Sequence, residues 1–139
     1  MTPTSPSLQE FLRVAQQAFD YLRSDYGFSR CLSGDNPYSV QFSRDQTSIL
    51  VEGINWGFGV NILLSHEGER APLWAFAIAK GCYEPPASGQ LEQLRQYAVL
   101  LKTAAETILR GDASAFPAAL SAMSEASAEA SKPKPRTLP

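Results

Sequence analysis

The most reactive side chains of this chain are His66 and two cysteines. His66 is the only histidine in 139 residues and lies in Ser65-His66-Glu67-Gly68-Glu69, a segment typical of a polar turn. General acid–base catalysis, a catalytic triad or a zinc site would need His, Cys or acidic residues at spacings that bring them together, and no such motif is recognisable. We therefore expect no catalytic residue, no metal and no cofactor.

Two alternatives would give these side chains a functional role. An enzyme would have to use His66 with Glu67 or Glu69, or a thiol that its neighbours activate. Cys31 and Cys82 have no CxxC spacing, which favours two free thiols, with a disulfide or a reactive thiol as the alternative. The prediction is a protein that is not an enzyme and that acts by binding.

The composition argues against several classes of partner. A hydrophobic fraction of 44% and a charged fraction of 19% are ordinary for a globular domain. The formal net charge of −2 does not favour nucleic acid, which usually requires a basic patch. Apolar runs are far shorter than the roughly 20 residues that cross a bilayer. Residues 1–6 lack the features of a secretory signal, so we expect a cytoplasmic protein with no membrane partner.

The N-terminal part predicts an amphipathic helix over 8–26. Ser7 and Glu10 form a capping box, and apolar residues then recur every three or four positions. Gly27 follows as a residue able to adopt the left-handed conformation that ends helices, with Phe28 as its hydrophobic partner.

From residue 28 to about residue 79 the apolar period changes to two, which predicts β-strands. Strands are expected at about 38–43, 47–52, 58–65 and 73–79, and their short connections favour an antiparallel meander of four or five strands. The predicted core face gathers large apolar side chains: Tyr38, Val40, Phe42, Ile49, Val51, Phe58, Val60, Ile62, Trp74, Phe76 and Ile78.

A second, long helix is predicted over 91–110 and ends at Gly111. A short third helix, capped by Asp112 or Ser114, carries Phe116, Leu120 and Met123. Residues 124–139 are rich in Ser, Ala, Lys and Pro and predict a disordered tail. The expected fold class is α+β: one domain over 1–123, with the helices packed on one face of the sheet.

The opposite face of the predicted sheet is small, mixed and nearly free of charge. It is either a solvated face partly covered by the third helix, or a flat surface for a partner protein or a second copy of the chain. Trp56, near the tip of the hairpin at 53–57, either anchors such an interface or packs over the sheet edge. The residues expected to bind a partner are Glu52, Trp56, Gly59, Asn61, Leu63 and Ala75.

Acidic residues fall mostly in the predicted turns of the meander, at Asp35, Asp45, Glu52, Glu67, Glu69 and Glu84. Solvated turn residues are one interpretation. The other is a negative patch that steers a basic partner.

Two pairs of motifs carry a resemblance to a known family. They are Phe19-Asp20-Tyr21-Leu22 with Asp25-Tyr26-Gly27-Phe28, and Leu94-Arg95-Gln96-Tyr97-Ala98 with Ile108-Leu109-Arg110-Gly111-Asp112. Over about residues 8–123 the chain resembles small bacterial proteins with this opening and closing, many of them immunity proteins of polymorphic toxin systems. The resemblance implies a protein that neutralises a toxin by direct binding, and it transfers no functional residue to this sequence.

A second resemblance is to the small acidic chaperones of type III secretion, which are α+β proteins that dimerise and hold an extended effector segment. Those chaperones interrupt their strands with a dimerisation helix, and residues 28–80 offer no good helical period for one. A chaperone or adaptor for a secreted effector is therefore the alternative to an immunity-type protein.

Overall fold

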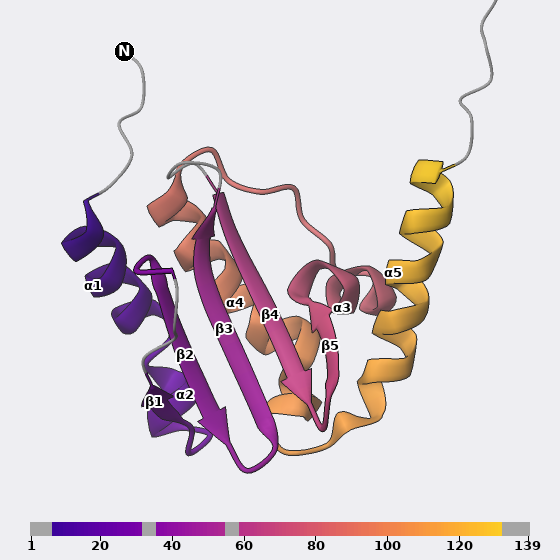
Figure 1. Cartoon of the computed structure of the whole chain (residues 1–139), viewed down its shortest axis with the longest axis horizontal. Helices are drawn as coiled ribbons and strands as arrows, with labels where there is room; N and C mark the ends of the chain where they lie inside the picture. Colours follow the sequence, from indigo (N-terminus) through magenta and orange to yellow (C-terminus); the bar gives the residue numbers. More distant parts are fainter. Residues whose placement is uncertain (1–6, 32–35, 55–58, 132–139) are drawn as a thin grey trace, which may run out of the picture.

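The computed structural model describes residues 7–31, 36–54 and 59–131, which form an antiparallel sheet with helices packed against one face (Figure 1). This confirms the predicted α+β class. The elements are α1 (Leu8–Ala18), α2 (Tyr21–Ser24), β1 (Ser29–Cys31), β2 (Ser39–Arg44), β3 (Thr47–Ile54), β4 (Gly59–His66), β5 (Glu69–Pro72), α3 (Leu73–Lys80), α4 (Gln90–Leu109), the 3-10 helix η2 (Ala113–Ala115) and α5 (Phe116–Ser131).

The predicted N-terminal helix is divided into α1 and α2 by a turn at Phe19 and Asp20. Ser7 caps α1, because its Oγ accepts a hydrogen bond from the Glu10 N–H at 3.2 Å. Phe19 remains fully buried, so the turn preserves the apolar face that contacts the sheet. Gly27 ends α2 with φ of +75°, as predicted.

The sheet has five strands in chain order, β1 to β5, and every neighbouring pair is antiparallel. Its core face carries Val40, Phe42, Ile49, Val51, Val60, Ile62 and Leu64, all buried. Phe58, also expected there, lies outside the described residues. The fifth strand is β5, which follows β4 after a two-residue turn at Glu67 and Gly68 in a segment predicted to be only a turn.

The prediction of a strand at 73–79 is wrong, because this segment forms α3. Leu73, Phe76 and Ala77 are buried at helical spacing, whereas Trp74 and Ile78 are 36% and 44% exposed and do not belong to the core face. Alternating large residues and alanines fit a period of two, but alanine is also the strongest helix former. Gly81, with φ of +75°, ends the helix.

The long helix α4 matches the prediction and lies behind the sheet in Figure 1, with α3 and α5 at the β5 side. Asp112 caps the turn that follows, since its carboxylate accepts a hydrogen bond from Ser114 N–H at 2.9 Å. The last helix, α5, is longer than expected: it continues to Ser131, into the part predicted as a disordered tail, while 132–139 lie outside the described residues.

Candidate protein-binding surface and adjoining pocket

The face of the sheet opposite the core has no described helix in front of it (Figure 1). We call this surface the open face. Strand register places its members in rows across the sheet: Ser29, Cys31, Ser39, Gln41, Ser43, Ser48, Leu50, Glu52, Ile54, Gly59, Asn61, Leu63, Ser65, Arg70 and Pro72. Among these described residues only Glu52 and Arg70 are charged. A weakly charged, flat surface is suited to a protein partner, because burying it leaves few charges unpaired.

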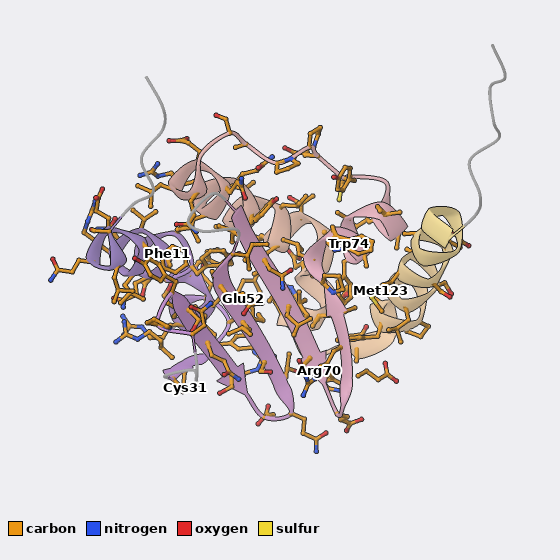
Figure 2. The ribbon with its side chains drawn as sticks, turned by 45° about the horizontal axis from the view of Figure 1, so that its top comes forward. Phe11, Cys31, Glu52, Arg70, Trp74 and Met123 are labelled. Atoms are coloured by element: carbon orange, nitrogen blue, oxygen red, sulfur yellow. The ribbon has the colours of Figure 1, made fainter. Side chains whose placement is uncertain are left out.

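The centre of the open face is apolar. Leu50 and Leu63 are direct neighbours across β3 and β4, and both are half-buried rather than covered. Beside them, Glu52 pairs with Asn61, whose amide nitrogen donates to the Glu52 carboxylate at 2.9 Å. Figure 2 shows Glu52 in the middle of the sheet, with Cys31 and Arg70 on strands to either side.

Register places four of the six residues expected to bind a partner on the open face, and three of them, Glu52, Asn61 and Leu63, are accessible there. Gly59 is buried at the start of β4, where its carbonyl accepts a hydrogen bond from Gln90 at 2.9 Å. Ala75 is a correction, because it is fully buried in α3 and cannot contribute to a surface. Trp56 lies outside the described residues.

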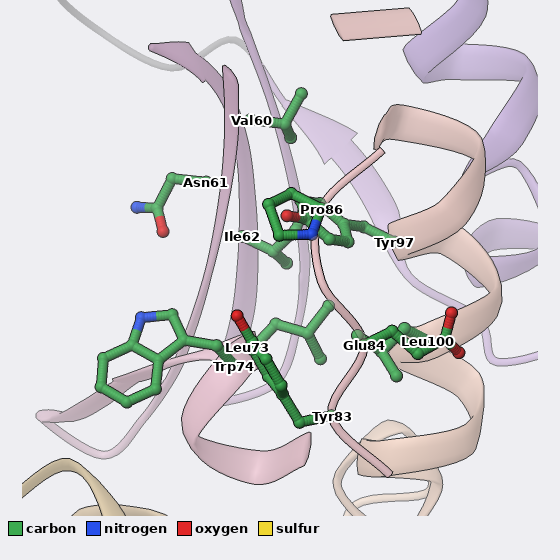
Figure 3. Close-up of a pocket in the computed structure, with 10 residues that line it drawn as sticks. All are labelled: Val60, Asn61, Ile62, Leu73, Trp74, Tyr83, Glu84, Pro86, Tyr97 and Leu100. Atoms are coloured by element: carbon green, nitrogen blue, oxygen red, sulfur yellow. The ribbon is translucent and has the colours of Figure 1, made fainter. Parts of the chain in front are cut away.

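A pocket of about 120 Å³ adjoins the open face beyond the end of β5 (Figure 3). We call it the Trp74 pocket; it is lined by Val60, Asn61, Ile62, Leu73, Trp74, Tyr83, Glu84, Pro86, Tyr97 and Leu100. Figure 3 shows Tyr97 and Leu100 projecting from α4, whereas Asn61 and Trp74 point to the other side, away from that helix. Asn61 therefore belongs to both the open face and the pocket.

One buried glutamine of α4 positions the loop that forms the outer wall of this pocket. The Gln93 Oε1 accepts a hydrogen bond from the Val60 N–H at 3.0 Å, and its Nε2 donates to the Ala87 carbonyl at 2.8 Å. Gln96 adds two bonds of 2.8 Å, from its Nε2 to the Pro85 carbonyl and from the Ala87 N–H to its Oε1. The loop is thereby fixed to β4 and α4 by side-chain amides.

Two tyrosines of the pocket lie close to one another. Burial raises the pKa of the Tyr97 phenol, and the neighbouring Tyr83 raises it further. Neither phenol oxygen has a hydrogen-bond partner among the described residues. Tyr83 is 51% exposed, so the pocket combines a buried apolar floor with hydroxyl groups that remain free to bind a ligand.

The residues with reactive side chains occupy other positions. The His66 Nδ1 lies 2.8 Å from the Thr47 hydroxyl, and the His66 ring lies 6.2 Å from the ring of Phe116. Cys31 and Cys82 are free thiols, the former exposed. Within the described ranges, no three His, Cys, Asp or Glu side chains form a group that could hold a metal ion.

No described helix combines the length and the apolar character needed to span a membrane. Comparisons with known proteins add no relative, because no family model, no curated protein and no solved structure matches the chain.

The Trp74 pocket was not predicted from the sequence, although the spacing of three glutamines indicated where its wall lies. Glutamines recur at 90, 93 and 96, at helical spacing along the face of α4 that meets β4 and the loop. Amides repeated on a helix face directed at the core need hydrogen-bond partners, and here backbone groups of β4 and of the loop supply them.

Proposed function

We propose that this chain is a non-catalytic binding protein of the immunity type, which neutralises a toxin by covering part of it with the open face of the sheet. The observation that carries the proposal is the uncovered pair Leu50 and Leu63 in the centre of a sheet whose other face packs against helices. Protein interfaces concentrate their binding energy in a central, weakly charged region of this kind.

The open face also has features that would set specificity. Glu52 is held by Asn61 in a fixed position beside the apolar centre, so a partner must supply a cation or a donor there. Exposed Trp74 lies next to this corner, and tryptophan is among the residues most enriched in interface hot spots. The motif resemblance supplies the type of partner, a toxin.

The test captures partners from the native host with the full chain, using wild type, Leu63→Arg and Val99→Arg in parallel. Leu63→Arg places a charge in the open face, whereas Val99→Arg adds the same charge to a residue of α4 that is 69% exposed. We expect a partner whose affinity falls at least about thirtyfold with Leu63→Arg, corresponding to about 2 kcal/mol, and is unchanged with Val99→Arg. Circular dichroism and urea unfolding confirm that both variants fold.

The captured protein is then expressed alone and together with the chain. An immunity role requires that it arrests growth when alone and that wild type, but not Leu63→Arg, restores growth. A partner that binds Leu63→Arg as tightly as wild type contradicts the open-face interface. A partner that is harmless but aggregates without the chain replaces the immunity role by the secretion-chaperone alternative.

A further inference from the structure

We infer that the Trp74 pocket takes one apolar side chain of a partner protein, of the size of phenylalanine or leucine, flanked by lysine or arginine. The inference rests on the proposed function, because the same partner covers the open face. It assigns to the protein a defined subsite with its own chemistry.

The volume of the pocket sets the size of its occupant. An apolar cavity of about 150 Å³ accommodates benzene, and the pocket of about 120 Å³ is slightly smaller, which limits its occupant to about one ring or one branched aliphatic group. The floor consists of Ile62, Leu73 and Leu100, which are all buried, so it offers apolar contacts to that group.

The phenols of Tyr83 and Tyr97 favour an occupant attached to a polypeptide. Both hydroxyl groups can donate and accept hydrogen bonds, and neither has a partner within the described part of the chain. A peptide that inserts one side chain also brings its own backbone carbonyl and N–H groups to the rim, where these hydroxyls can bind them. A free hydrocarbon offers neither phenol a hydrogen-bonding group.

The position of the pocket connects it to the proposed interface. Asn61 lines the pocket and at the same time holds Glu52 on the open face. Trp74 lies on the same side as Asn61, so a surface that covers Glu52 and Asn61 also reaches the pocket (Figure 3). Interfaces commonly place an anchoring side chain in such a pocket beside a flat contact area.

The charges around the pocket indicate which residues should flank the inserted apolar side chain of the partner. Glu84 is the only charged residue in the lining, and Glu52 on the adjoining open face is bonded to Asn61, which itself lines the pocket. Both are acidic, so a lysine or arginine beside the inserted side chain gains favourable contacts, and an acidic flank is repelled.

The test uses the full chain with labelled isoleucine and leucine methyl groups and follows Ile62 and Leu100 by NMR. The probes are acetyl-Arg-Phe-Lys-amide, acetyl-Arg-Ala-Lys-amide, acetyl-Glu-Phe-Glu-amide and free benzyl alcohol. We expect saturable shifts of both methyl signals with the first peptide, and Kd values at least tenfold higher with the other three probes. Tyr97→Phe, which removes only a hydroxyl group, should weaken the first peptide at least threefold. Ile78→Ala, exposed on the same helix as Trp74 but outside the lining, should leave its Kd unchanged.

Three outcomes overturn the inference. Absence of methyl shifts with every probe means that the pocket takes no such group. Benzyl alcohol binding as tightly as the first peptide assigns the pocket to a free small molecule. Equal Kd values for the phenylalanine and alanine peptides would show that the pocket does not bind the phenylalanine side chain. Because Leu63 does not line the pocket, peptide binding by Leu63→Arg separates failure of this inference from failure of the open-face interface.

Discussion

The Gln93 Oε1 accepts a hydrogen bond of 3.0 Å from the Val60 N–H, in the part of β4 that does not pair with β5. The Nε2 of the same side chain donates to the Ala87 carbonyl. Gln93 therefore supplies to β4 a hydrogen bond that a neighbouring strand would otherwise provide. This arrangement holds the loop against β4 and thereby shapes the Trp74 pocket.

Replacing Gln93 by leucine should lower the free energy of unfolding by about 1–3 kcal/mol, because the Val60 N–H would be left buried without an acceptor. Urea unfolding measures the change. Gln96→Leu is the matched control: its partners lie on the partly exposed loop, where water can replace them, and we expect a smaller loss. An equal loss for both variants would show that Gln93 has no special role.

The packing of α3 predicts opposite results for two of its aromatic residues. Phe76→Ala should lower the free energy of unfolding by about 3–5 kcal/mol, because Phe76 is buried and contacts the ring of Phe116 edge-on. Trp74→Ala should cost much less, about 1 kcal/mol, since Trp74 is partly exposed. Thermal unfolding of both variants measures the difference, and a large loss for Trp74→Ala would contradict the partly exposed position of Trp74.

The protein should lose stability at alkaline pH through Tyr21. Burial and the neighbouring Tyr26 raise the pKa of Tyr21 in the folded state well above its usual value of about 10. The contribution of the protonated Tyr21 phenol to the free energy of unfolding is therefore complete below pH 10. It is lost as the pH rises above 10, because this phenol releases its proton at a lower pH in the unfolded chain than in the folded protein. Tyr21→Phe should flatten this decline by at most about 1.4 kcal/mol per pH unit.

At neutral pH, Tyr21→Phe should lower the free energy of unfolding by about 0.5–1.5 kcal/mol, because it removes the hydrogen bond of 2.6 Å that the Tyr21 hydroxyl donates to the Ala98 carbonyl. Tyr83→Phe, at an exposed site, is the control. If Tyr21→Phe and Tyr83→Phe show identical pH profiles between pH 9 and 11, roughly the range in which tyrosine titrates, the burial of Tyr21 has no effect on stability.

Deleting residues 124–139 should leave the thermal midpoint nearly unchanged. The buried residues described in α5 are Phe116, Ala119 and Ala122, all of which precede the deletion. A decrease of more than about 5 °C, on the order of 1 kcal/mol, would show that the deleted part packs on the domain.

The sequence predicted those parts of the fold in which one local signal dominates. Helix α4 has a long apolar stripe ended by Gly111, and strands β2 to β4 alternate strictly, so their type and inward face could be inferred. The segment 73–80 could not be assigned from its pattern, since alternating bulky residues and alanines are compatible with both a strand and a helix. Its helical state depends on Pro72 and Gly81 at its ends and on packing against α4 and α5.

The candidate surface was partly predictable for the same reason. A period of two places Glu52, Asn61 and Leu63 on one face, and strand register then makes them neighbours. The Trp74 pocket was not predictable, because its walls come from β4, α3, the loop before α4, and α4 itself. Their meeting depends on tertiary packing, and misassigning α3 placed Trp74 in the core and Ala75 on the surface.

The two outermost strands have a consequence for how the protein associates. β1 has three residues and β5 has four; β5 carries Glu69 and Arg70, and it ends at Pro72, which has no N–H to donate. Long, flat outer strands template the growth of fibrils, whereas short strands with charge and proline resist it. A sheet built in this way can leave one weakly charged face uncovered and still resist edge-to-edge polymerisation.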